Sequence, residues 1–121
     1  AETSSIRIYD FNAKQVGTLV GEGLFDFGDI DGASEMVRMQ HPMGITAGRT
    51  ELFVADCYNH KIKSIELNGA FTRTVYGEIK GQLNEPQGLA KAGKYLLIAD
   101  TNHHQILCLD PQTGTAHILI E

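Results

Sequence analysis

The feature that most constrains the fold of this chain is an internal repeat. Segment 41–67, HPMGITAGRTELFVADCYNHKIKSIEL, aligns without a gap on segment 85–110, EPQGLAKAGKYLLIADTNHHQILCLD. Every matching pair is 44 residues apart, as for Pro42 with Pro86 and Asp56 with Asp100. Chance rarely keeps proline, glycine, aspartate and isoleucine in phase together, so the chain repeats one structural unit.

A third, partial copy opens the chain. Segment 6–10 matches 62–66, and segment 19–21 matches 75–77, both at an offset of 56 residues. The offset exceeds the repeat by 12 residues, which must lie between Gly21 and Pro42. We therefore predict one domain over 1–121, made of a half blade (1–21), an inter-blade insert (22–41) and two blades (42–77 and 78–121).

Each repeat has the pattern of four short strands separated by turns. We expect strands at 44–47, 52–55, 61–67 and 71–76, at 88–90, 95–99, 105–109 and 115–120, and at 6–10 and 16–20 in the half blade. The second strand of each repeat is apolar on both faces, which is typical of a strand buried between two sheets. A four-stranded unit of about 44 residues is the size of a β-propeller blade.

The predicted fold is therefore all-β, with about two and a half four-stranded antiparallel blades of a propeller. A blade buries its faces against its neighbours, and two and a half blades cannot close a ring. We expect either that the chain is a fragment of a longer protein, whose remaining blades cover its open faces, or that copies associate as a homo-oligomer.

The repeated motif resembles the NHL repeat. Pro-x-Gly, then Leu-Phe-Val-Ala-Asp-x-x-Asn-His-x-Ile, spans 42–62, and an equivalent motif spans 86–106. This resemblance implies a propeller that commonly has six blades. Three further segments, SSIR at 4–7, LFDFGDIDG at 24–32 and RMQHPMG at 38–44, resemble a subgroup in which an NHL propeller follows a thioredoxin-like domain. The chain would then correspond to its C-terminal blades.

Charge and composition exclude several classes of function. The formal net charge is −5 and the pI about 5.5, which disfavours nucleic-acid binding because phosphate contacts need clustered Lys and Arg. No apolar run is long enough to span a bilayer, so no membrane partner is expected. The two cysteines form no CxxC, which assigns no redox chemistry to these residues and leaves the compartment open, with a reducing cytoplasm favoured.

Strand direction brings certain loops to one end of the fold. Because the strands of a blade alternate in direction, loops 56–61 and 100–105, the insert and segment 78–85 share what we call the loop-rich end. Binding residues usually lie on loops held by a rigid scaffold. We expect a protein or peptide partner to bind there through Arg38, His41, Tyr58, His60, Lys61, Asn102 and His104.

Two repeated acids invite either a structural or a catalytic interpretation. Asp56 and Asp100 follow a buried strand at the same position of each repeat, which favours a structural role in accepting hydrogen bonds from the next turn. The alternative is a metal-assisted lyase or hydrolase that uses them with His60 and His104. No third ligand stands at a recognisable spacing, so we assign no metal, cofactor or catalytic residue.

The insert contains a partial calcium motif. Asp29-x-Asp31-Gly32 resembles part of a calcium loop, but Phe27 stands where the first acid belongs and Arg38 stands at the last position. We expect instead that Leu24, Phe25 and Phe27 anchor the insert, that Asp26, Asp29 and Asp31 face solvent, and that 33–39 forms a helical turn with Met36 and Met39 one turn apart.

The two cysteines have different predicted environments. Cys57 lies in a loop and is the better candidate for a reactive thiol, although no flanking cation marks it. Cys108 lies in an apolar strand and is expected to be a small buried hydrophobic residue.

Overall fold

The computed structural model describes residues 4–21 and 27–121, and all its strands are antiparallel. The strands are β1 (Ile6–Asp10), β2 (Gln15–Val20), β3 (Pro42–Ala47), β4 (Glu51–Asp56), β5 (Lys61–Glu66), β6 (Thr72–Tyr76), β7 (Pro86–Ala92), β8 (Tyr95–Asp100), β9 (Gln105–Asp110) and β10 (Thr115–Ile120). Three single 3-10 turns complete the secondary structure: η1 (Ser34–Met36), η2 (Cys57–Asn59) and η3 (Thr101–His103). All ten predicted strands are present, with ends that differ from the prediction by two residues at most.

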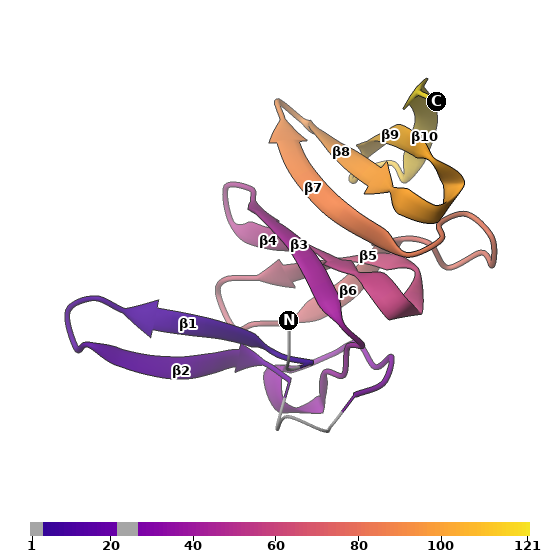
Figure 1. Cartoon of the computed structure of the whole chain (residues 1–121). Coiled ribbons are helices and arrows are strands. Elements are labelled where there is room, and N and C mark those ends of the chain that lie inside the picture. The colour runs from indigo at the N-terminus through magenta and orange to yellow at the C-terminus, as the bar shows by residue number, and fades with distance from the viewer. Residues whose placement is uncertain (1–3, 22–26) are drawn as a thin grey trace.

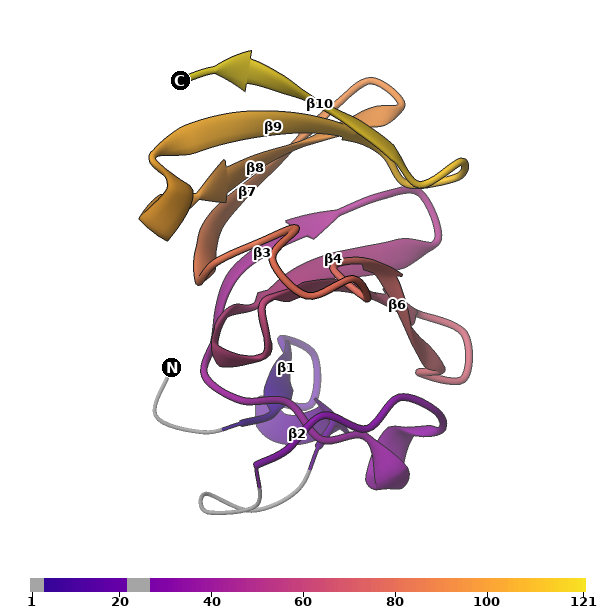
Figure 2. The same ribbon diagram turned by 90° about the vertical axis from the view of Figure 1, so that its right-hand side faces the viewer.

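The strands form three sheets in chain order. β1 and β2 make a hairpin, the half blade; β3-β4-β5-β6 make the middle blade; β7-β8-β9-β10 make the last blade. The sheets follow one another across the molecule as neighbouring blades do (Figures 1 and 2). The predicted fold class, partial propeller blades, is confirmed. Within the described residues no helix is long and apolar enough to cross a membrane.

The core lies between blades rather than within one. One buried cluster joins the middle and last blades and contains Phe53, Ala55, Ile62, Leu83, Leu96, Ile98, Leu107 and Leu109. The second joins the half blade, the insert and the middle blade and contains Val20, Val37, Met39, Val54, Ile65 and Ala70. Neighbouring residues of β4, Phe53 and Val54, thus fill opposite faces, as the apolar pattern of that strand predicts.

The insert packs differently from the prediction. Phe27 is 62% exposed, so its role as an anchor is wrong, while Leu24, Phe25 and Asp26 lie outside the described residues. Within the predicted turn at 33–39 only η1 is helical, and Met36 is exposed whereas Met39 is fully buried. The reason is that the backbone becomes extended at Val37, where residue 38 pairs with Ile30, so that Val37 and Met39 point into the core.

The first strands of the middle and last blades approach closely at a glycine. A Cβ atom on Gly44 of β3 would lie 2.3 Å from the carbonyl oxygen of Gln87 and 3.0 Å from the nitrogen of Leu89, both in β7. Gly88 is the equivalent residue of β7, and a Cβ there would meet only the Cβ of Ala99, at 3.2 Å. Gly44 therefore allows the inter-blade approach.

We expect Gly44→Ala to lower the free energy of unfolding by about 2 kcal/mol, because the added methyl group forces β3 and β7 apart. Urea denaturation of the purified chain measures the change. Gly88→Ala is the matched control and should cost less than about 1 kcal/mol, since its nearest neighbour is one side-chain methyl group. Equal costs at the two glycines would contradict this account of the interface.

Candidate functional site

Two buried aspartates hold the loop-rich end together in the same way. Asp56 ends β4 and Asp100 ends β8, and both are fully buried. The backbone N–H of Gln40 donates to Oδ1 of Asp56 at 2.7 Å, and that of Asn84 donates to Oδ1 of Asp100 at 2.8 Å. Each aspartate therefore connects the end of the second strand to the loop that enters its blade. We call this hydrogen bond, from a backbone N–H of the loop to the buried aspartate, a latch.

The acids accept from different donors than predicted. We expected backbone N–H groups of the following turn, but neither 3-10 turn has a side-chain cap hydrogen bond. The turn contributes side chains instead: Nδ2 of Asn59 donates to Asp56 at 2.8 Å, and Nδ1 of His103 lies 2.6 Å from Oδ2 of Asp100. The donors are different because the acids point toward the inter-blade loop.

A second pair of equivalent bonds fixes the same backbone. The N–H of Tyr58 donates to the carbonyl oxygen of Gln40 at 3.0 Å, and the N–H of Asn102 donates to that of Asn84 at 3.1 Å. The loop-rich end is thus a repeated framework of backbone bonds, from which the side chains of the turns project.

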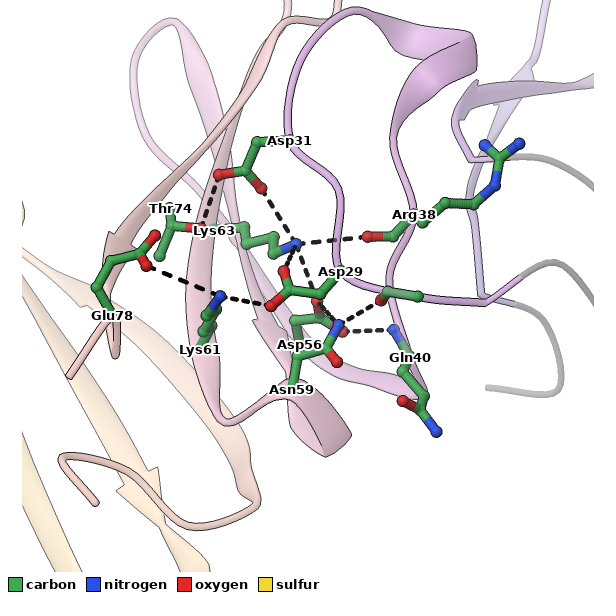
Figure 3. A network of polar contacts seen from close by, with 11 residues as sticks. Asp29, Asp31, Arg38, Gln40, Asp56, Asn59, Lys61, Lys63, Thr74 and Glu78 are labelled. Atoms are coloured by element: carbon green, nitrogen blue, oxygen red, sulfur yellow. Dashed lines mark hydrogen bonds and ion pairs between the residues drawn. The ribbon is translucent and has the colours of Figure 1, made fainter. Parts of the chain in front are cut away.

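The buried ammonium group of Lys63 lies at the centre of the strongest electrostatic feature (Figure 3). Its Nζ lies 2.8 Å from Asp29, 3.1 Å from Asp31 and 3.2 Å from Asp56, and it donates to the carbonyl oxygen of Arg38 at 3.4 Å. We call Lys63 and these four oxygen partners the lysine interlock, because it joins the insert to β5 of the middle blade.

The lysine interlock overturns the prediction for the acids of the insert. Asp29 and Asp31 were expected to face solvent, but their carboxylates converge on Lys63, and the ammonium of Lys61 also pairs with Asp29. The physical reason is that a buried ammonium needs opposite charges around it. The acid spacing that resembles a calcium loop therefore holds a lysine ammonium.

The repeat shows how unusual Lys63 is. The equivalent residue of the last blade is Leu107, which lies in the apolar cluster between the two blades. At the interface with the insert, the same strand position carries a charge instead. Thr74 extends the contact by donating its hydroxyl to Asp31 at 2.8 Å.

Burial and charge shift the pKa values within the lysine interlock. Partial burial alone would raise the pKa of Asp29, but hydrogen bonds from Lys61 and Lys63 outweigh it and hold that pKa below its usual value. Burial alone would lower the pKa of Lys63, but Asp29, Asp56 and Asp31 hold it above its usual value. For Asp56, burial prevails over the neighbouring ammonium and raises the pKa of the carboxyl.

The residues predicted to bind a partner fall into two groups. Arg38 and Lys61 belong to the lysine interlock and its margin, since Lys61 pairs with Asp29 and lies 3.9 Å from Glu78. The others lie on the framework of the turns: Tyr58, His60, Asn102 and His104 are exposed, and His41 stacks on Tyr58.

The structure does not assemble the residues of the metal-assisted alternative. Asp56 and Asp100 are each engaged in a separate latch, and Nδ1 of His60 accepts the backbone N–H of Glu85 at 2.9 Å. Among the described residues no group of three or more His, Cys, Asp or Glu side chains is placed to hold a metal ion.

The loop position of Cys57, which made it the better candidate of the two cysteines for reactivity, does not leave it exposed. Its side chain is buried, and burial, together with the charges of Glu85 and Asp56, raises the pKa of the thiol. A thiol in that state is a poor nucleophile at neutral pH. Cys108 is buried in β9, as its apolar strand predicts.

Three residues that hold this end together are not among the predicted site residues: Lys63, Asn84 and Glu85. The sequence contains an indication for Lys63. The repeat aligns this lysine with Leu107, which lies in the mainly apolar stretch 106–109 of the last blade. Asn84 acts through its backbone, which no side-chain pattern reveals, and Glu85 gains its importance from neighbours in another blade.

Comparison with known proteins agrees with the repeat. No family model matches the chain. It is similar to NHL repeat-containing protein 2 of Bos taurus, with 37% identity over 138 residues, 98% of this chain and 19% of that protein. NHL repeat-containing protein 2 of Gallus gallus is 38% identical over the same share of each chain. The chain carries NHL repeats.

Other relatives place these NHL repeats within longer proteins. Protein SUPPRESSOR OF QUENCHING 1, chloroplastic, of Arabidopsis thaliana is 37% identical over 136 residues, which cover 94% of this chain and 12% of that protein. The NHL repeats described here therefore span about a fifth, or less, of the length of the curated relatives.

Solved structures support the fold of the NHL repeats. An auxiliary nutrient binding protein from Bacteroides ovatus superposes with a TM-score of 0.69 at 14% identity, over 87% of this chain and 32% of that one. A structural genomics protein of unknown function from Bacteroides thetaiotaomicron gives 0.66 at 14% identity, over 85% and 26%. At this identity the likeness extends to the fold alone.

We expect Lys63→Met to lower the free energy of unfolding by about 3 kcal/mol, because the carboxylates of Asp29, Asp31 and Asp56 lose their counter-charge. Leu107→Met is the matched control at the equivalent position and should cost less than about 1.5 kcal/mol. Urea unfolding of both variants measures the difference. If the lysine variant is no less stable than the control, the lysine interlock does not stabilise the chain.

The lowered pKa of Asp29 predicts a pH dependence. A carboxyl with a lower pKa in the fold stabilises it above the unfolded value of 3.8, and this contribution is lost as pH falls through the folded pKa. Asp29→Asn should therefore destabilise the chain at neutral pH, and its cost should shrink as the pH falls below 3.8.

Unfolding curves of the wild type and Asp29→Asn across this range give the cost at each pH. The comparison isolates what is lost with Asp29, including its coupling to Asp56 through Lys63. Glu121→Gln removes one charge at the exposed last residue and serves as the control, with a cost near zero throughout. A cost of Asp29→Asn that stays constant down to the lowest pH would contradict the prediction.

Proposed function

We propose that this segment is a non-catalytic interaction platform, whose loop-rich end binds a protein or peptide. The observation that supports it is a pair of equivalent surface contacts with different chemistry. His41 stacks on Tyr58, with ring centroids 4.5 Å apart, and the equivalent residues Glu85 and Asn102 form a hydrogen bond of 2.6 Å. The same framework thus carries an aromatic pair in one blade and a polar pair in the next.

The framework supports this role because both blades form the same backbone hydrogen bonds at this end, whereas the side chains of their turns differ. Gln40 and Asn84 bond to Asp56 and Asp100 through backbone N–H groups. Tyr58 and Asn102 also donate through backbone N–H groups, so their side chains are not needed for these bonds. A surface whose backbone is held in advance loses little entropy on binding. Such an arrangement is typical of repeat proteins that bind through one face.

The charge of this end favours a basic partner over a nucleic acid. Acids outnumber bases here: Asp29, Asp31, Asp56, Glu78, Glu85 and Asp100 stand against Arg38, Lys61, Lys63 and Lys80. Electrostatic complementarity steers and selects partners of opposite charge.

A hollow at the opposite end of the fold is the main alternative binding site for a partner. It measures about 800 Å³ and is lined by short turns that include Arg49, Lys94 and Gln112. Its charges are partly compensated within the chain, as Lys94 lies 3.7 Å from Asp110. Substitutions in its lining therefore serve as the comparison for the loop-rich end.

Two other roles stay predictions of the sequence. A propeller that supports a thioredoxin-like redox domain elsewhere in a parent protein rests on the narrower resemblance. Contact with further blades or with a second copy would cover the open faces, where Ile118, Leu119 and Ile120 of β10 are exposed.

A random peptide library displayed on phage tests the platform. Peptides selected on the immobilised chain are measured against two triple variants. Tyr58→Ala with His60→Ala and Asn102→Ala changes the loop-rich end, whereas Arg49→Ala with Lys94→Ala and Gln112→Ala changes the opposite hollow. We expect the first variant to weaken the selected peptides by about tenfold or more, and the second by less than about twofold.

Two outcomes would overturn the proposal: no enriched peptide, or peptides that lose affinity only on the variant of the opposite end. Both variants change exposed or partly exposed side chains, and unfolding curves verify that each still folds.

A further inference from the structure

A hollow lies between the aromatic pair of the middle blade and the polar pair of the last blade. It measures about 460 Å³ and is lined by Gln40, Tyr58, His60 and Glu85. These residues come from the insert, the η2 turn and the loop that enters the last blade. The hollow therefore exists only because two blades are packed side by side.

Glu85 gives this hollow a carboxylate that has no ion-pair partner among the described residues. Among the residues the structure describes, no lysine or arginine lies within ion-pair distance of Glu85, although Asp29, Asp31 and Glu78 of the same end all have such partners. Its Oε2 accepts from Nδ2 of Asn102 at 2.6 Å, which orients the half-buried carboxylate.

His60 holds the backbone of Glu85 at the edge of the hollow. Its Nδ1 accepts the backbone N–H of Glu85 at 2.9 Å. The carboxylate of Glu85 also contributes to the raised thiol pKa of buried Cys57.

Tyr58 supplies an aromatic surface beside the carboxylate. Its ring stacks on His41 at an interplanar angle of 25°, and its backbone N–H is bonded to Gln40, so both its backbone and its ring are supported. The side chain is nevertheless 48% exposed and lines the hollow. A cation placed over such a ring is attracted by the negative face of the π system.

We infer that this hollow binds an arginine side chain of the peptide partner. A planar guanidinium can stack on Tyr58 while its N–H groups donate to Glu85 and to the side-chain carbonyl of Gln40. A lysine ammonium, as a compact hydrated charge, matches the ring less well. The inference rests on the proposed function, since it names the chemistry of the partner at that surface.

Amide NMR titrations with three capped peptides test the inference: acetyl-Gly-Gly-Arg-Gly-Gly-amide and its lysine and citrulline analogues. Citrulline keeps the shape of arginine without the charge. We expect the arginine peptide to shift the amide signals of Tyr58, His60 and Glu85, and to bind about tenfold more tightly than the citrulline peptide. The lysine peptide should fall between them.

Glu85→Gln should weaken the arginine peptide by about tenfold and abolish its advantage over citrulline. Glu78→Gln is the matched control, because it removes the same charge from the same end outside the hollow, and it should change affinity by less than about twofold. Tyr58→Leu provides a second variant that removes the aromatic surface and keeps the carboxylate, with an expected loss of about threefold.

Equal weakening by Glu85→Gln and Glu78→Gln, or equal affinity for arginine and citrulline, would overturn the inference. Peptides from the display library separate this result from a failure of the platform itself. If they bind the loop-rich end but carry no arginine, the arginine site is wrong and the platform stands. If no peptide binds that end, both are wrong.

Discussion

The loop-rich end depends on one interaction that occurs twice, a buried aspartate that accepts the backbone N–H of the loop entering its blade. A carboxylate with no exposed surface is costly unless its oxygens are fully used. Asp56 and Asp100 satisfy this by joining three segments each: the end of a strand, the following turn and the inter-blade loop. The cost of burial thus fixes the position of the loops.

The lysine interlock solves a different problem at the insert. A blade with an ordinary loop packs leucine against its neighbour, as Leu107 does. At this point the insert presents the carboxylates of Asp29 and Asp31, which need donors, while its buried apolar residues Val37 and Met39 pack in the second cluster. A buried ion pair contributes less net stability than apolar packing, but it tolerates few other arrangements. Lys63 therefore determines where the insert lies more than how strongly it is held.

The repeat made most of the fold predictable, but it gave little information about the structure of the insert. Strand positions followed from the offset of 44 residues, and the recurrence of Asp56 and Asp100 favoured a structural role for them. The partners of Asp29 could not be predicted this way, because Lys61 and Lys63 lie 32 and 34 residues away and the insert has no second copy. The loop position of Cys57 misled for a similar reason, since packing against other segments buries it.

The backbone itself shows which side chains of the loop-rich end matter. Six non-glycine residues have a positive φ in the described chain, and four of them lie at this end: His41, His60, Glu85 and His104. Glycine adopts that conformation without strain, and the chain uses it at other turns, including Gly32 and Gly81 at this end. Retaining a side chain at a strained position makes sense where the side chain has a use. Three of these four side chains make contacts: His41 stacks on Tyr58, His60 accepts the N–H of Glu85, and Glu85 accepts from Asn102. His60 and Glu85 line the hollow, and His41 stacks on Tyr58, which also lines it. The strain and the proposed recognition surface therefore coincide.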